Sequence, residues 1–121
     1  QEVFFRRKQQ RIAGKAGDRL TRDLQQIINK YNLPYVAYNQ GSIVHLETSG
    51  VMLLDFRNPI RLAKEMKPRK HMLEEMGAAY MANGLVTLAG SRMYTSLADT
   101  DEVIDDALAR FEAVLANIEL N

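Results

Sequence analysis

The pattern of apolar and polar residues predicts a helix at each end of the chain and a set of short strands between them. Residues 1–31 carry apolar and small residues at the three- and four-residue spacing of one helix face. These are Ala13, Gly17, Leu20, Leu24, Ile27 and Tyr31. Gly14 and Gly17 each cost a helix interior about 1 kcal/mol relative to alanine. We therefore expect a break near them, with Asp18 or Thr21 beginning a second helical piece.

A second apolar stripe predicts a C-terminal helix over residues 100–118. Its apolar positions are alternately four and three residues apart, as on a helix face that packs against a core. They are Ile104, Leu108, Phe111, Leu115 and Ile118. Asp99 is predicted to cap this helix, with Glu102 reaching back to the cap amide. The acidic first turn suits the positive end of the helix dipole.

Short β-rich and apolar runs between residues 35 and 97 predict the strands of a sheet. These runs span residues 35–38, 42–48, 51–56, 85–88 and 92–97. Asn39-Gln40-Gly41 is the predicted hairpin turn between the first two. Alternation along the second strand puts Val44 and Leu46 on one face and His45 on the other. Because the connections are mostly short, we expect one mainly antiparallel sheet.

Two further helices are predicted within this region. Asn58-Pro59 is typical of a helix start, in which a capping residue precedes a proline in the first turn. Pro68 is expected to separate a short helix over residues 60–66 from a second one over residues 69–83. The second carries a methionine-rich stripe, which we expect to fill the core and not to form an adaptable binding surface. The stripe consists of Met72, Met76, Ala79 and Asn83, with Leu73 and Tyr80 beside it.

These elements predict an α+β fold, in which a small, mainly antiparallel sheet of three to five strands is covered by helices. Residues 1–121 are expected to form a single domain. Its parts are a helical entry segment at residues 1–31, a sheet with inserted helices at residues 35–97 and the C-terminal helix. A chain of this length can bury roughly two thirds of its unfolded surface, so it needs no disulfide or metal to fold.

Composition excludes several classes of function. The chain has no cysteine, which excludes cysteine nucleophiles, zinc ribbons and iron–sulfur ligation. A formal net charge of +1 argues against a dedicated nucleic-acid binder. The basic residues near the start are not interleaved with aromatic residues that could stack on bases, so a solvated helix face is favoured. No apolar segment reaches the roughly 20 residues that span a bilayer, and the N-terminus lacks a secretory pattern. We therefore expect a cytoplasmic protein with no membrane partner.

Few residues combine into a recognisable reaction centre. His45 is predicted to be a strand residue and His71 a helix-surface residue, and their spacing does not indicate a metal site. No catalytic, cofactor-binding or metal-binding residue is predicted. Arg92 is the one candidate for substrate binding, because it begins a strand after a Gly-Ser turn and a guanidinium can grip a carboxylate through two hydrogen bonds. An ordinary surface arginine is the alternative.

Two stretches of the chain resemble a known family. Asn83-Gly84-Leu85-Val86, followed by a strand that ends in Thr95-Ser96-Leu97-Ala98-Asp99-Thr100 and an acidic helix start, is similar to the C-terminal end of class-III pyridoxal-phosphate aminotransferases. The likeness is greatest to the glutamate-1-semialdehyde aminomutase branch, where Leu-Ser-x-Ala-His-Thr precedes the last helix. Gly41-Ser42-Ile43-Val44-His45-Leu46 resembles that branch's Gly-Ser-Met strand. Asp99 stands where the family usually has histidine, and residues 49–70 depart from the family pattern.

The resemblance implies the small C-terminal domain of a fold-type I enzyme, which covers the substrate side of the active site. The family binds pyridoxal phosphate through a lysine of a large domain, and no lysine here stands in that setting. We therefore expect the chain to be a domain or fragment that is inactive and binds no cofactor by itself. The implied partners are the missing large domain and an amino-acid or amino-ketone substrate. By resemblance to several class-III aminotransferases Arg92 binds the substrate carboxylate, although the aminomutase branch does not generally use an arginine there.

Two interpretations of different classes remain open. In the first, the chain is part of an aminotransferase or aminomutase. In the second, it is a free-standing α+β module for ligand sensing or dimerisation with no catalytic activity. In either case we expect self-association to a homo-oligomer, because Val3, Phe4 and Phe5 are consecutive apolar residues that we expect to pack on a second subunit or on other protein.

Overall fold

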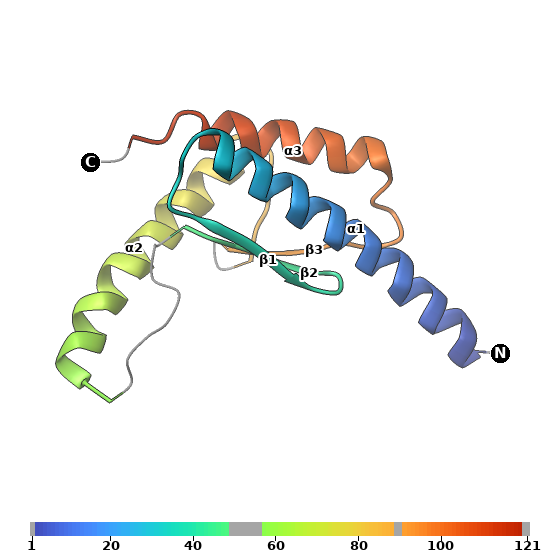
Figure 1. Cartoon of the computed structure of the whole chain (residues 1–121), viewed down its shortest axis with the longest axis horizontal. Helices are drawn as coiled ribbons and strands as arrows, with labels where there is room; N and C mark the ends of the chain where they lie inside the picture. The colour runs from blue at the N-terminus through green and yellow to red at the C-terminus, as the bar shows by residue number, and fades with distance from the viewer. Residues whose placement is uncertain (1, 49–56, 89–90, 120–121) are drawn as a thin grey trace.

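The computed structural model of the chain describes residues 2–48, 57–88 and 91–119, without the side chains of residues 65, 68 and 69. It is an α+β fold with a three-stranded antiparallel sheet in the order β1-β2-β3, which confirms the predicted fold class. Its elements are α1 (Glu2–Lys30), β1 (Val36–Gln40), β2 (Ile43–Glu47), α2 (Pro59–Ala82), β3 (Arg92–Tyr94) and α3 (Asp101–Leu115). Helices α1 and α3 lie together across one face of the sheet, whereas α2 runs away from it (Figure 1).

Helix α1 is one unbroken helix, so the predicted break near its glycines is wrong. The hairpin turn between β1 and β2 packs directly on α1 at this point. A Cβ atom on Gly17 would lie 2.2 Å from the carbonyl oxygen of Gly41 and 3.3 Å from the Cα atom of Ser42. Gly17 therefore allows the close approach of two backbones, and the packing gained there outweighs its low helix propensity.

The β1–β2 hairpin has a shorter turn than the predicted Asn39-Gln40-Gly41. Gln40 pairs with Ile43, so the chain reverses over the two residues Gly41 and Ser42. Gly41 has a φ of +58°, which glycine adopts without the penalty that a side chain brings. The predicted alternation is confirmed on the core side of β2, where Val44 and Leu46 are fully buried.

Helix α2 begins as predicted but continues through Pro68. The side chain of Asn58 accepts a hydrogen bond from the backbone amide of Arg61, and Pro59 occupies the first turn. The predicted division at Pro68 is wrong. A proline inside a helix costs about 3 kcal/mol because one backbone hydrogen bond is lost. Here it lies in an exposed half of the helix, between Lys64 and Lys70, where water can bond to the freed carbonyl.

The core forms where α1, the sheet, the end of α2 and α3 meet. Predicted stripe residues of all three helices are buried there, and Met76 fills the core as expected. The buried apolar residues are Leu20, Leu24, Ile28, Tyr35, Ala37, Val44, Leu46, Met76, Tyr80, Ile104, Leu108, Phe111, Val114 and Leu115. The rings of Tyr80 and Phe111 meet edge to face, with centroids 5.2 Å apart.

The cap of α3 differs from the prediction by one residue. Thr100 is the cap, and its hydroxyl accepts a hydrogen bond from the amide of Val103 at 3.4 Å. The carboxylate of Asp99 instead accepts a hydrogen bond from the amide of Ser96 at 2.6 Å, within the turn that precedes the helix. The helix itself ends at Leu115, three residues before the predicted limit.

One predicted strand, at residues 85–88, does not form, and another, at residues 92–97, is shorter than predicted. Residues 85–88 form no strand, because only Leu88 pairs, in a single bridge with Arg92. The amide of Leu85 donates to the carbonyl of Tyr80 and, with Gly84 at a φ of +82°, closes the end of α2. The last strand spans only Arg92–Tyr94 of the predicted residues 92–97. The predicted strand at residues 51–56 lies outside the described residues.

Candidate functional site

One face of the sheet is covered by α1 and α3, and no described helix covers the other (Figure 1). We call the second face the open sheet face and define it by Tyr38, Ile43, His45, Arg92 and Tyr94. His45 on β2 stands opposite Tyr38 on β1 and opposite Arg92 on β3. Residues directly opposite in an antiparallel sheet share a face, so these three side chains form a row across all three strands.

Within this row the Tyr38 and His45 side chains are stacked. Their ring centroids are 5.0 Å apart and their planes differ by 2°. The partial burial of His45 and, secondly, the positive charge of Arg92 lower the pKa of the imidazole below its usual 6.5, while Glu47 opposes this shift. His45 is therefore neutral at pH 7, and Arg92 carries the only positive charge of the row.

The backbone of Arg92 is held firmly where β3 begins. Its amide donates to the carbonyl of Leu88 at 3.0 Å, and its carbonyl accepts from the amide of Leu88 at 2.8 Å. The neighbouring Ser91 carbonyl accepts a hydrogen bond from the amide of Leu46 at 2.9 Å. No carboxylate among the described residues forms an ion pair with the exposed guanidinium of Arg92. Its planar set of donors is therefore available to a carboxylate or a similar anion.

The remaining titratable residues form no second centre in the described part of the chain. His71 lies on the surface of α2, as predicted, and its imidazole is 3.1 Å from the carboxylate of Glu75. No group of three His, Cys, Asp or Glu side chains within the described residues could hold a metal ion. None of the helices described here is long and apolar enough to cross a membrane.

The described residues do not fit a pyridoxal-phosphate site. That cofactor needs a lysine for its aldehyde and an acidic residue near its ring nitrogen. Every lysine of the chain lies on α1 or α2 with an exposed side chain. Lys64 and Lys67 border a depression on the exposed half of α2, beside Ala63 and His71, and none of its described lining residues is acidic. Lys30 is held by Glu112 at 2.6 Å.

The sequence placed Arg92 at the start of a strand but did not place Tyr38 and His45 beside it. The reason is the position of the hairpin turn. With a turn over residues 39–41, Tyr38 would stand opposite Ser42, whereas the observed two-residue turn brings it opposite His45. The sequence signal for the shorter turn is Gly41 itself, which suits the first position of a two-residue hairpin.

Comparison with known proteins shows the fold of the chain. No protein-family model and no curated protein sequence matches it. Among solved structures, an omega-transaminase from Sphaerobacter thermophilus superposes with a TM-score of 0.64 over 86% of this chain, at 15% sequence identity. The chain thus has a transaminase-like fold. It spans 23% of the length of that transaminase.

Proposed function

We propose that the chain is the small, substrate-covering domain of a pyridoxal-phosphate-dependent class-III aminotransferase or of a glutamate-1-semialdehyde aminomutase-like enzyme. The observation that carries the proposal is the exposed guanidinium of Arg92 on the open sheet face, which forms no ion pair with any described residue. The resemblance at residues 83–86 and 95–105 and the transaminase-like fold support it. The cofactor lysine would belong to a large domain outside these residues, because no described lysine fits that role.

In this proposal Arg92 binds the carboxylate of an amino-acid or amino-ketone substrate through two parallel hydrogen bonds. The stacked rings of Tyr38 and His45 stand beside it as a neutral wall, which keeps Arg92 the only cation of the row at pH 7. A single cation in a defined position orients a substrate that carries one carboxylate. In the longer protein the cofactor supplies the electron sink for chemistry at the amino group.

The coding sequence on the 5′ side of Gln1 gives the first test. The proposal expects a large α/β domain with a cofactor lysine there. A start codon or an unrelated domain would favour the free-standing module instead. The chain of residues 1–121 mixed with pyridoxal phosphate gives a second test, in which we expect no absorbance band of a lysine-bound cofactor. A stoichiometric band from one lysine would contradict this assignment.

The role of Arg92 is tested by kinetics in the longer protein. Charge-assisted hydrogen bonds contribute about 1.5–3 kcal/mol, so Arg92→Gln should raise KM for a carboxylate-bearing amino donor by roughly 10- to 100-fold. The KM for an amine that has no carboxylate should stay unchanged, and Arg92→Lys should lie between. Arg22→Gln, on the exposed side of α1, is the matched control. Equal effects of Arg92→Gln on both donors would exclude carboxylate binding.

The aminomutase assignment needs a separate experiment. An aminomutase moves an amino group within one substrate, whereas an aminotransferase passes it to a second keto acid. If the longer protein isomerises an amino-ketone substrate with no keto acid added, the aminomutase assignment holds. A requirement for a keto-acid acceptor in each turnover would instead assign it to the aminotransferases and leave the role of Arg92 intact.

A further inference from the structure

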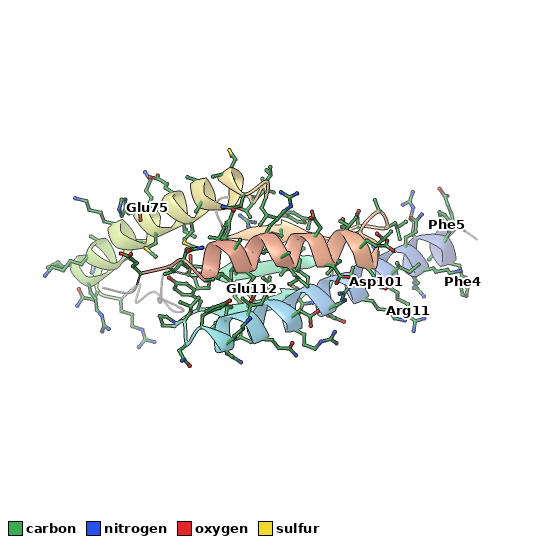
Figure 2. All side chains as sticks on the ribbon, turned by 90° about the horizontal axis from the view of Figure 1, so that it is seen from above. Phe4, Phe5, Arg11, Glu75, Asp101 and Glu112 are labelled. Atoms are coloured by element: carbon green, nitrogen blue, oxygen red, sulfur yellow. The ribbon has the colours of Figure 1, made fainter. Side chains whose placement is uncertain are left out.

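The first three turns of α1 extend beyond the rest of the molecule. We call residues 3–11 the α1 tip. Figure 2 shows Phe4, Phe5 and Arg11 on the part of α1 that projects past Asp101, the first residue of α3. The side chains of Phe4 and Phe5 are 81% and 62% exposed. Two neighbouring exposed phenylalanines on a projecting helix indicate a surface that binds another protein.

The α1 tip is also strongly basic. It carries Arg6, Arg7, Lys8 and Arg11, and the one acidic residue close by, Glu2, lies 3.5 Å from Arg6. Among the described residues, no acidic group pairs with Arg7, Lys8 or Arg11. The surface that the α1 tip suits is therefore acidic and offers an apolar recess for a phenyl ring.

The chain itself carries such a surface beside the start of α3. A cavity of about 220 Å³ opens between α1, β3, α3 and the connector after α2. We call it the α3 cavity. Its lining is mostly apolar and includes Leu20, Val86, Met93, Val103, Ala107 and Phe111. An apolar cavity of roughly 150 Å³ is large enough to bind benzene, so the α3 cavity can accept the ring of a phenylalanine.

The start of α3, beside the α3 cavity, is acidic. Asp99 lines the cavity, and Glu102 and Asp106 are exposed residues on the first two turns of α3. The carboxylate of Asp106 already lies 2.9 Å from the guanidinium of Arg110. Val86 and Val103, which line the cavity, are exposed. The α3 cavity thus places an apolar recess beside the acidic start of α3, which is complementary to the aromatic and basic α1 tip.

The α1 tip cannot reach the α3 cavity of its own chain. Phe4 precedes Leu20, which lines the cavity, by sixteen residues of one continuous helix. At 1.5 Å per residue, this places the two about 24 Å apart along the axis. Only another molecule can bring a phenylalanine of the α1 tip to the cavity.

We propose that a second copy of this chain inserts Phe4 or Phe5 of its α1 tip into the α3 cavity, with its basic residues against Asp99 and Glu102. Each chain carries both surfaces, so two contacts can form about a two-fold axis and close a dimer. This inference rests on surfaces of the chain alone and does not depend on the proposed enzymatic function.

Sedimentation velocity of the full chain tests the proposal over a range of protein concentrations at low and high salt. We expect a dimer whose dissociation constant increases at high salt, because exposed ion pairs are screened. Phe4→Ser together with Phe5→Ser should weaken association at least tenfold. Ala107→Met, which fills the cavity, should also weaken it. Lys70→Glu, which reverses one charge on the exposed half of α2 far from both surfaces, should leave association unchanged.

A charge exchange tests both the partner and the reciprocal geometry. Arg11→Glu and Glu102→Lys each place like charges at both contacts of a homodimer, so each variant alone should be largely monomeric. In an equimolar mixture, every contact of a mixed dimer is again between opposite charges, so dimers should return. A single-copy mass at all concentrations, or no recovery on mixing, would overturn the proposal. So would a loss of thermal stability in the Phe4 variant with no change in mass, because the α1 tip would then pack within its own molecule.

Discussion

Gly17 on α1 and Gly41 in the β1–β2 turn lie in direct backbone contact. A Cβ atom on Gly17 would approach the Gly41 carbonyl oxygen to 2.2 Å, far inside normal contact. Gly14, one turn earlier, faces the same turn at a greater distance, and its Cβ would lie 3.7 Å from the Cα atom of Gly41. The two glycines of one helix therefore differ in their packing, although both have the same helix propensity.

The first prediction follows from this difference. Gly17→Ala should destabilise the protein by about 2–4 kcal/mol, because the hairpin must move away from α1 to accept the methyl group. Gly14→Ala should instead stabilise it by about 0.5–1 kcal/mol, since alanine favours the helix and meets only ordinary van der Waals contact. Urea denaturation of the two variants measures both effects. Equal effects of the two substitutions would show that the hairpin does not pack against Gly17.

The same contact explains why the helix pattern was easier to predict than its interruptions. Apolar stripes, such as those that include Leu20 and Leu24 or Ile104 and Leu108, follow from a local spacing that can be read directly from the sequence. Breaks at Gly17 and Pro68 were predicted from propensity, and in both cases the helix continues. At Gly17 the low helix propensity of glycine is offset by packing against Gly41, 24 positions away, which the local sequence cannot reveal. At Pro68 the lost hydrogen bond is offset by water, and this depends on where the helix lies in the fold.

The candidate site shows a similar division. Arg92 could be selected from sequence because its chemistry and its place at a strand start are local properties. Its neighbours depend on the register of the sheet, and register depends on the length of one turn. In the predicted three-residue turn Tyr38 does not stand opposite His45. The row that these two residues form with Arg92 therefore appears only in the structure. The α3 cavity has lining residues from four separate segments and has no local signal.

The second prediction concerns the pKa of His45. Burial and the nearby charge of Arg92 both lower it, so Arg92→Gln should raise the pKa toward 6.5 while part of the burial effect remains. An NMR titration of the imidazole measures the change, and His71 on α2 is an internal reference whose signals should be the same in both proteins. No change at His45 would place Arg92 away from the row.

The titration of His45 also predicts a dependence of stability on pH. A histidine whose pKa is lower in the folded state binds its proton more weakly there than in the unfolded chain. Its contribution to stability is therefore complete above pH 6.5 and decreases as the pH falls through the folded pKa. His45→Gln should remove this component of the urea midpoint between about pH 7 and pH 5. An unchanged pH profile in the variant would contradict the lowered pKa.

The third prediction concerns the contact that joins the ends of α1 and α3. The carboxylate of Glu112 accepts hydrogen bonds from Lys30 at 2.6 Å and from the Tyr31 hydroxyl at 2.9 Å. The bond from Lys30, followed by that from Tyr31, lowers the pKa of Glu112 below its ordinary 4.5. Its contribution to stability is therefore present above pH 4.5 and lost as the pH falls through the folded pKa. Glu112→Gln should show a smaller fall in urea midpoint between about pH 6 and pH 3 than the parent protein. Glu119→Gln, beyond the end of α3, should keep the parent profile.

The fourth prediction concerns the hydroxyl of Tyr80 in the core. The side chain is fully buried, and no described group forms a hydrogen bond with its oxygen. Burial raises the pKa of Tyr80, so the hydroxyl stays protonated at neutral pH. A buried polar group without a partner costs about 1–3 kcal/mol. Tyr80→Phe keeps the edge-to-face contact with Phe111 and removes that cost, so it should increase the free energy of unfolding by about 1 kcal/mol. Tyr80→Leu, which loses the ring contact as well, should destabilise the protein. A lower urea midpoint for Tyr80→Phe would show that the hydroxyl has a hydrogen-bond partner in solution.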